Sequence, residues 1–455
     1  MKILFTLESS AGMEVKMKQI KGGVTAAKGF KAASTAAGIK YKDRTDMAMI
    51  YSEVPCAVAG TFTTNIVKAA PVKWDQHVVY DSKKAQAVIV NAGIANACTG
   101  EEGMGYCKAT AEKVNKLLQI PTDEVLVAST GVIGMQLPID RICAGVETMV
   151  PQLNGDIESG HNAALAIMTT DTHEKEVAVE IELSGKTVTI GGMCKGSGMI
   201  HPNMCTMLSF VTTDAAISQE LLLEALKADV EDTYNMISVD GDTSTNDTCL
   251  LLANGMAENT KITEKNADYE TFTKALRFVN ETLAKQMAGD GEGATALFEV
   301  KVIGAETKEQ AKIGYVAAYP YAEVISGYTA FLLGVRSVVP DAVMSVRYTN
   351  NWNDYLTEKK YAKEFIDEGC VIISQHSDTT GPATACEATD SDTPVYIVSY
   401  NESMANVAPT TYLTGCKINW EPYVTGAVES VLKDKKIEEN VKGNVVGNDM
   451  GAGFE

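Results

Sequence analysis

The sequence predicts an α/β protein that consists of two segments of different composition. Short apolar runs alternate with helical stretches along the 455 residues, and the aromatic residues are unequally distributed. Residues 1–312 contain 14 Phe, Tyr and Trp residues, whereas the much shorter stretch 313–455 contains 16. A single domain seldom divides its aromatic residues in this way, so we expect a domain boundary near residue 312.

The first segment contains the pattern of a layered α/β domain. Apolar runs at 87–91 and 125–129 predict buried strands, each ending in a polar loop with glycine. Apolar and polar residues alternate at 176–183 and 186–190, and Ser184-Gly185 between them predicts a hairpin turn. Helices are expected over two stretches with helical spacing of apolar residues, 218–233 and 269–287.

The second segment predicts a parallel sheet, because strands and helices alternate along it. Strands are expected at 312–318, 343–349, 370–375 and 395–399, with helices at 322–336 and 356–368. Ligands bind beyond the carboxyl ends of such strands. Residues 375–378 and Tyr400-Asn401 occupy that position, although His376 and Asp378 are interpreted as polar loop residues rather than catalytic ones.

Charge and composition argue against several classes of function. Lys and Arg number 39 against 59 Asp and Glu, which gives a net charge of −20 and disfavours nucleic-acid binding. The histidines lie far apart and no CxxC pair occurs, so a metal site is not expected. The apolar run at residues 1–7 is too short for a signal peptide, and no run suits a membrane span. The expected compartment is the cytoplasm.

Two glycine-containing segments could support catalysis. Residues 195–208 begin with Lys-Gly-Ser-Gly but lack the spacing of a phosphate-binding loop, so a tight turn is the plain alternative. In residues 129–134, a hydroxyl beside a glycine N–H could form a two-donor oxyanion hole, although turns share this composition.

Two acidic segments need separate interpretations. Asp240, Asp242 and Asp247 suggest a calcium loop, but the EF-hand Glu at the twelfth position is absent, and turn capping is the leading interpretation. Glu292 lies between glycines directly after the second expected helix.

Seven blocks of the first segment are distinctive when taken together: 91–100, 129–134, 168–172, 195–199, 205–208, 240–248 and 290–295. In this order they resemble the ornithine acetyltransferase / glutamate N-acetyltransferase family of arginine biosynthesis, from about Met17 to about Gln310. Cys205 stands where that family usually has Ala, Ala296 where it has Lys, and Ile94 where it has Asn.

The resemblance implies that the Cys205–Thr206 bond cleaves itself and that Thr206 becomes an N-terminal nucleophile. A freed α-amino group, with a pKa of about 7.7–8.0, could then act as the base for its own hydroxyl. The resemblance also implies an oxyanion hole formed by Thr130 and Gly131. The substrate-binding residues that it implies are Thr169, Lys195, Thr206 and Glu292.

The implied reaction moves acetyl from N-acetylornithine to glutamate by a ping-pong cycle through acetyl-Thr. In bifunctional members of the family, acetyl-CoA is also a donor substrate. No metal or organic cofactor is implied. The expected partners are amino-acid substrates, and the α and β chains produced by cleavage are expected to associate as a heterotetramer.

The second segment departs from this family, whose own C-terminal stretch supplies an Asn and a Thr or Ser to the substrate site. Instead, residues 314–323, 369–378 and 419–420 resemble part of the basic-membrane-lipoprotein family of substrate-binding proteins. That resemblance implies one lobe of a two-lobed binder of nucleoside-like ligands. The chain thus resembles a join of two truncated proteins near residues 310–312.

The expected fold is therefore a self-processing N-terminal-Thr acyltransferase fold, followed by a partial parallel-sheet βαβ lobe of periplasmic-binding-protein type. The expected divisions are an acetyltransferase α chain at 1–205, a truncated β chain at 206–312, and the partial lobe at 313–455. Two alternatives to acetyl transfer are ligand binding for a transport system and a join of two proteins in which neither half works.

Overall fold

The computed structural model describes most of the 455 residues. The described residues are 4–7, 15–200, 207–237, 239, 244–292, 312–336, 339, 342–390, 393–416 and 421–433. The chain divides into two compact units, Met1–Leu297 and Phe298–Glu455. Each unit has hydrophobic clusters of its own, so the units are considered separately.

The first unit contains a ten-stranded sheet in the order β1-β2-β7-β8-β9-β10-β4-β5-β6, with β3 paired to β4. The strands are β1 (Leu4–Leu7), β2 (Val15–Ile20), β3 (Phe30–Thr35), β4 (Met47–Phe62), β5 (Lys84–Ile94), β6 (Val125–Val132), β7 (Lys175–Leu183), β8 (Lys186–Lys195), β9 (Leu208–Thr213) and β10 (Thr248–Ala253). The pairs β5–β6 and β9–β10 are parallel, and the other neighbours are antiparallel.

Strand β4 connects two layers of this sheet. Its first half, Met47–Ser52, pairs with β3, and Ala57–Phe62 pairs with β10. Between the layers lies one core cluster, to which β4 contributes Ala48, Ile50 and Val58. Successive side chains of a strand point to opposite faces, so Met47 and Met49 instead pack beneath the helices on the outer face.

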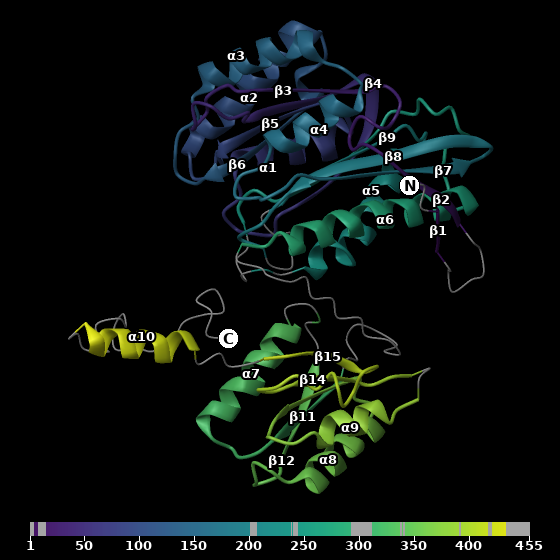
Figure 1. Cartoon of the computed structure of the whole chain (residues 1–455). Coiled ribbons are helices and arrows are strands. Elements are labelled where there is room, and N and C mark those ends of the chain that lie inside the picture. The colour runs from purple at the N-terminus through teal and green to yellow at the C-terminus, as the bar shows by residue number, and fades with distance from the viewer. Residues whose placement is uncertain are drawn as a thin grey trace. The chain divides into compact units, whose positions relative to one another are not determined.

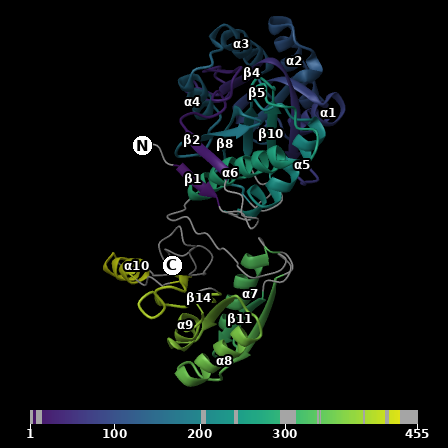
Figure 2. The same cartoon turned by 90° about the vertical axis from the view of Figure 1, so that its right-hand side faces the viewer.

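The helices of this unit are α1 (Ala70–His77), α2 (Gly100–Leu118), α3 (Ile139–Met149), α4 (Ile157–Ala166), α5 (Gln219–Glu231) and α6 (Ala267–Gly289). Of these, α4 contributes Ala163, Ala164 and Ala166 to the cluster between the layers. Figures 1 and 2 show α2 and α3 on one side of the strands and α5 and α6 on the other. Three helices start at a side-chain cap, because Asp156, Ser218 and Asn266 each accept a backbone N–H from the first turn. The unit is therefore a helix–sheet–sheet–helix stack.

The expected hairpin and both expected helices are confirmed as β7–β8, α5 and α6. The expected positions of three loops are wrong, because the strands continue further. Strand β6 includes Thr130 and Gly131, β5 extends to Ile94, and β8 ends at Lys195 itself. The apolar runs alone underestimated these strands, since pairing between neighbours extends them over polar and glycine residues.

The second unit is a five-stranded parallel sheet in the order β12-β11-β13-β14-β15. Its elements are β11 (Lys312–Ala317), α7 (Ala322–Arg336), β12 (Val343–Tyr348), α8 (Tyr355–Asp367), β13 (Ile372–His376), α9 (Gly381–Glu387), β14 (Tyr396–Ser399), β15 (Tyr412–Gly415) and α10 (Glu421–Leu432). Residues of α8 and α9 pack with one face of the sheet and residues of α7 with the other. The expected parallel βαβ sheet is confirmed, although His376 ends a strand rather than lying in a loop.

Candidate active site

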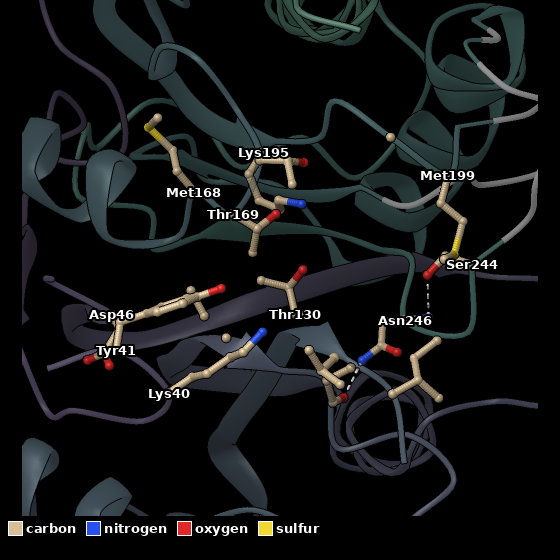
Figure 3. A pocket seen from close by; sticks show the side chains of 18 of the residues that line it. Lys40, Tyr41, Asp46, Thr130, Met168, Thr169, Lys195, Met199, Ser244 and Asn246 are labelled. Carbon is tan, nitrogen blue, oxygen red and sulfur yellow. Dashed lines mark hydrogen bonds between the residues drawn. The ribbon is translucent and has the colours of Figure 1, made fainter. Parts of the chain in front are cut away.

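The first unit contains a cavity of about 440 Å³ that is lined by both sheet layers. Its described lining consists of Lys40, Tyr41, Arg44, Asp46, Ala92, Gly93, Ala95, Thr130, Gly131, Val132, Ile133, Met168, Thr169, Thr170, Lys195, Gly198, Met199, Ser244, Asn246 and Glu292. Figure 3 shows Lys40, Thr130, Thr169 and Lys195 around this hollow. A cavity of this size can enclose a substrate the size of an amino acid.

Five site residues expected from the sequence meet at this cavity. Thr130, Gly131, Thr169, Lys195 and Glu292 all line it, although 162 positions separate the first from the last (292 minus 130). The other two expected residues, Cys205 and Thr206, lie outside the described residues.

Alternation along the strands directs Thr130 into the space between the layers. Thr130 lies two and four residues after Ala128 and Leu126, which belong to the core cluster between the layers. The side chain is buried, with 4% of its surface exposed. The hydroxyl therefore lies at the end of the interlayer core, where the cavity opens.

Gly131 has a conformation that other residues rarely adopt. Its φ is +128°, and it pairs with Gly93, whose φ is +109°. A Cβ on Gly131 would lie 2.2 Å from the carbonyl carbon of Gly93, closer than any real contact. Only glycine at position 131 permits this approach of the two strands beside Thr130.

Lys195 presents a buried cation to the cavity. Its side chain is 3% exposed, and its Nζ lies 3.8 Å from Oδ2 of Asp171. Burial lowers the pKa of Lys195, and the negative charge of Asp171 acts in the opposite direction. Lys195 thus places an amino group at the edge of a low-dielectric core, where its charged form suits the binding of a carboxylate.

Glu292 is held against the glycine-rich segment that follows β8. Its N–H donates to the carbonyl of Ser197 over 2.6 Å, and Ser197 Oγ lies 2.6 Å from Thr170 Oγ1. A Cβ on Gly198 would lie 2.6 Å from the carboxyl carbon of Glu292, so the absence of a side chain there leaves space for the carboxyl group. The carboxyl group and the ammonium of Lys195 line one cavity with opposite charges.

Asp247 fixes the residue that follows Thr206 in the sequence. Met207 N–H donates to Oδ1 of Asp247 over 3.0 Å, and the carbonyl of Met207 accepts from Thr248 N–H over 3.1 Å. Burial raises the pKa of Asp247 well above its usual range. Asp247 thus binds backbone 40 residues away in the sequence. Asp240 and Asp242 lie outside the described residues.

Several lining residues were missed by the sequence analysis. Asn246 is buried, and its Nδ2 donates to the carbonyls of Ala95 and Ser129, at 2.6 and 2.8 Å. Arg44 donates to the carbonyls of Met168 and Thr169. These side chains bind the backbone of other segments. Asn246 could have been found from the sequence, because it is a polar residue inside one of the seven distinctive blocks, whereas Arg44 lies outside them.

The second unit carries an aromatic cluster beyond the carboxyl ends of its strands. The rings of His376 and Tyr400 lie 3.8 Å apart, Trp352 lies 6.1 Å from His376, and Tyr319 lies 6.0 Å from Trp352. Burial lowers the pKa of His376. This edge of a parallel sheet is where ligands bind in such folds.

Two general features concern only the part of the chain that the structure describes. Within it, no helix is long and apolar enough to cross a membrane. Nor do three or more His, Cys, Asp or Glu side chains gather in it as metal ligands would.

Comparison with known families identifies the first unit. A model described as the ArgJ family matches residues 31–318, which is well over half of the chain. The chain belongs to the ArgJ family. This confirms the family and the acyltransferase fold expected from the sequence, and with them the enzyme class, an acetyltransferase.

Individual ArgJ proteins are similar to this chain. Arginine biosynthesis bifunctional protein ArgJ 1 of Clostridium acetobutylicum is 54% identical over 286 residues, 62% of this chain and 69% of that protein. Arginine biosynthesis bifunctional protein ArgJ of Caldanaerobacter subterraneus is 51% identical over 297 residues, 65% of this chain and 73% of that protein. The crystal structure of ornithine acetyltransferase complexed with ornithine from Mycobacterium tuberculosis is 41% identical, with a TM-score of 0.38, and covers 42% of this chain and 100% of that chain.

The rest of the chain matches another family. A model described as ABC transporter substrate-binding protein PnrA-like matches residues 300–446 and overlaps the end of the ArgJ match. The second resemblance expected from the sequence is therefore confirmed as well. A solute-binding protein from Conexibacter woesei is 20% identical, with a TM-score of 0.24, and covers 28% of this chain and 40% of that chain.

Proposed function

We propose that the first unit is a self-cleaving ornithine acetyltransferase that moves acetyl from N-acetylornithine to glutamate in arginine biosynthesis. The observation that carries the proposal is the meeting of Thr130, Gly131, Thr169, Lys195 and Glu292 at one cavity in an ArgJ-family chain. These residues supply hydroxyl, backbone, cationic and anionic groups, which together suit an acylated amino acid.

In this proposal, maturation precedes transfer. Thr206 Oγ attacks the carbonyl carbon of Cys205, the acyl group moves from nitrogen to oxygen, and water hydrolyses the resulting ester. The products are a carboxylate on Cys205 and a free α-amino group on Thr206. This amine then accepts the proton of the neighbouring hydroxyl. The hydrogen bond from Met207 N–H to Asp247 supports the proposal, because it anchors the chain directly after the nucleophile.

The transfer cycle has two balanced halves. Thr206 Oγ attacks the acetyl carbonyl of N-acetylornithine, the carbon–nitrogen bond breaks, and ornithine leaves with the proton. The α-amine of glutamate then attacks the acetyl ester, and the hydroxyl of Thr206 is restored. Thr130 Oγ1 and the N–H of Gly131 stabilise the oxyanion in both halves, and each such donor is typically worth about 3–4 kcal/mol.

Charge complementarity assigns roles to the remaining residues. Lys195 binds the substrate carboxylate and Glu292 the δ-ammonium of N-acetylornithine, because each group needs an opposite charge in a partly desolvated site. Thr169 contacts the substrate from the facing segment. Acetyl-CoA is proposed as a second donor, and neither a metal nor an organic cofactor takes part. We place the enzyme in the cytoplasm, with its α and β chains associated as a heterotetramer.

Maturation is tested by the mass of the purified full chain. The expected products are residues 1–205 and 206–455, and the second should begin Thr-Met-Leu-Ser-Phe. The variant Thr206→Ala should remain one chain. A wild-type chain that stays intact through long incubation would contradict self-cleavage. Native mass spectrometry of the products tests the heterotetramer.

Transfer is tested by ornithine release from N-acetylornithine, with and without glutamate. A ping-pong enzyme should release about one ornithine per active site without glutamate, as a burst. Continued release of ornithine should require glutamate. Adding acetyl-CoA with glutamate tests the second donor, and dialysis against a chelator tests the independence from metal. No burst from a cleaved wild-type protein would contradict the proposed activity.

We expect cleavage to be retained better than transfer, because the second unit replaces the C-terminal stretch that completes the substrate site in this family. Loss of two positioning groups costs on the order of 10³-fold in rate. The matched comparison replaces residues 313–455 with a family-type C-terminus. Equal transfer rates in both proteins would show that those groups are dispensable.

A second candidate function belongs to the second unit, whose aromatic cluster suits a flat, nucleoside-like ligand. Calorimetric titration with nucleosides tests it, with His376→Ala as the comparison. A wild-type protein that produces no heat would contradict this function without bearing on acetyl transfer.

A further inference from the structure

Asp171 connects the two segments that border the cavity. Its Oδ1 accepts hydrogen bonds from Nζ of Lys175 over 2.8 Å and from Gly196 N–H over 2.7 Å. Its Oδ2 accepts the N–H of Thr169 over 3.0 Å. The Asp171 side chain is fully buried, so it reaches the cavity only through its neighbours Thr169 and Lys195.

The carboxylate of Asp171 also acts on Lys195 through its charge, without a hydrogen bond between them. Nζ of Lys195 lies 3.8 Å from Oδ2 of Asp171, too far for a hydrogen bond but close for two charges in a buried region. Among the residues with described positions, Asp171 is the one that forms an ion pair with Lys195. Three other donors bind the oxygens of Asp171, so the carboxylate acts on the ammonium of Lys195 through its charge rather than as a hydrogen-bond acceptor.

A second carboxylate balances the cluster. Nζ of Lys175 is fully buried and lies 2.5 Å from Oδ2 of Asp290, the residue that caps the end of α6. Asp290 also accepts the N–H of Thr172 over 3.0 Å. Lys175 therefore lies between two carboxylates, and it competes with Lys195 for the charge of Asp171.

The electrostatic balance follows these contacts. Burial alone would raise the pKa of Asp171, but the charges of Lys195 and Lys175 outweigh it and lower that pKa to about 2. Asp171 is therefore a carboxylate at any working pH. The titratable and charged groups that act on Lys195 are Asp171, Lys175, Cys194 and Asp247. Those elsewhere on the cavity lining are Lys40, Tyr41, Arg44, Asp46 and Glu292.

We propose that Asp171 is a positioning residue that keeps the ammonium of Lys195 charged and available to a substrate carboxylate, and that Lys175 limits this effect. The proposal rests on the proposed function only for the identity of the ligand, an amino acid. Asp171 acts through Lys195 and through the backbone of Thr169 and Gly196, and does not touch the substrate.

Charge-changing variants of the full chain test this proposal through the titration of Lys195. Competitive labelling with acetic anhydride, read by mass spectrometry, reports the pH at which each lysine becomes a free amine. Asp171→Asn removes a negative charge, so Lys195 should lose its proton at a pH at least one unit lower. Lys175→Met removes a positive charge, so Lys195 should keep its proton to a higher pH. A merely structural role would not produce opposite shifts.

Matched controls keep the test interpretable. Lys18→Met removes an exposed lysine that pairs with Glu180 on β7, and it should leave the labelling of Lys195 unchanged. Asp290→Asn removes the other carboxylate partner of Lys175, keeps an acceptor for Thr172, and should shift the labelling of Lys175 more than that of Lys195. If Asp171→Asn does not fold, as judged by circular dichroism, the labelling of Lys195 in Lys175→Met decides the question. Shifts in one direction for Asp171→Asn and Lys175→Met, or none in any folded variant, would overturn the proposal.

Kinetics separate this inference from the proposed function. In Asp171→Asn, the KM for N-acetylornithine should rise about 10- to 100-fold at pH 8, with kcat changed less than about threefold. A fall in kcat at unchanged KM would overturn the positioning role. If the wild-type chain releases no ornithine, while Asp171→Asn and Lys175→Met shift the labelling of Lys195 in opposite directions, the proposed function is contradicted and the role of Asp171 is supported.

Discussion

Gly93 and Gly131 lie opposite each other in the parallel pair β5–β6, and each has a positive φ. Their contact leaves no space for a methyl group on Gly131, because its Cβ would lie 2.4 Å from the carbonyl oxygen of Gly93. The backbone beside Thr130 is therefore defined by close packing of two strands rather than by a free turn.

The first prediction concerns Gly131→Ala. The added methyl group clashes with backbone and enforces an unfavourable φ, so the unfolding free energy should fall by about 3 kcal/mol or more. Gly134 also has a positive φ, of +83°, but nothing lies within 4 Å of its Cβ position. Gly134→Ala should therefore cost only about 1 kcal/mol. Chemical denaturation measures both unfolding free energies. Equal losses in the two variants would show that the positive φ alone, and not the clash with Gly93, makes Gly131→Ala unfavourable.

The second prediction concerns the hydroxyl of Thr130. If Thr130 belongs to the oxyanion hole, Thr130→Ala should reduce acetyl transfer by about 10²- to 10³-fold with little change in stability. Thr110 is a buried threonine on α2 whose hydroxyl donates to the carbonyl of Tyr106. Thr110→Ala should cost about 1 kcal/mol of stability and leave transfer unchanged. Parallel losses of stability and transfer in Thr130→Ala would favour a structural role.

A third prediction follows from the buried carboxyl group of Asp75 on α1. Its Oδ1 accepts the N–H of Val127 over 2.8 Å, and burial raises its pKa well above the usual range. The folded protein then holds a proton that the unfolded chain releases, so stability falls as pH rises from about 4 through the raised pKa. The slope is at most about 1.4 kcal/mol per pH unit.

Asp75→Asn keeps an acceptor for Val127 and removes the titration, so its stability should depend less on pH than that of the wild type. Denaturation between pH 4 and pH 8 provides the measurement. Glu112→Gln, at an exposed position on α2, is the control and should follow the wild-type curve. A wild-type protein that gains stability relative to Asp75→Asn with rising pH would refute the sign of this argument.

The fourth prediction concerns Glu358, a fully buried residue on α8. Its Oε2 accepts the hydroxyls of Ser377 and Thr379, at 2.8 and 2.7 Å, and thereby holds the segment after β13. Glu358→Ala should destabilise the second unit by about 2–3 kcal/mol. Hydrogen exchange of peptides from residues 312–416 measures this in the full chain. Glu402→Ala, at an exposed position, should have no such effect.

Local patterns in the sequence predicted most elements with regular apolar spacing, such as α5, α6 and the hairpin β7–β8. They did not predict β4, whose sixteen residues mix polar, glycine and apolar positions and depend on partners on both sides. The site residues came from resemblance, because nothing in the spacing of Thr130 and Glu292 indicates that both line one cavity. Lys40 and Arg44 were missed, since their position depends on how distant strands pack.

The double pairing of β4 constrains the order in which a chain leaving the ribosome can fold. The first half of β4 finds its partners β3 and β5 within about one hundred residues of the N-terminus, so the layer beneath α2 and α3 can form early. The end of β4, Val58–Phe62, must wait until β10, at Thr248–Ala253, has been translated. Asp247 emerges together with β10, so the backbone of Met207 gains its acceptor at the same late moment. Bond cleavage before Thr206 would therefore follow synthesis of β10, when the segments to be separated already share one core.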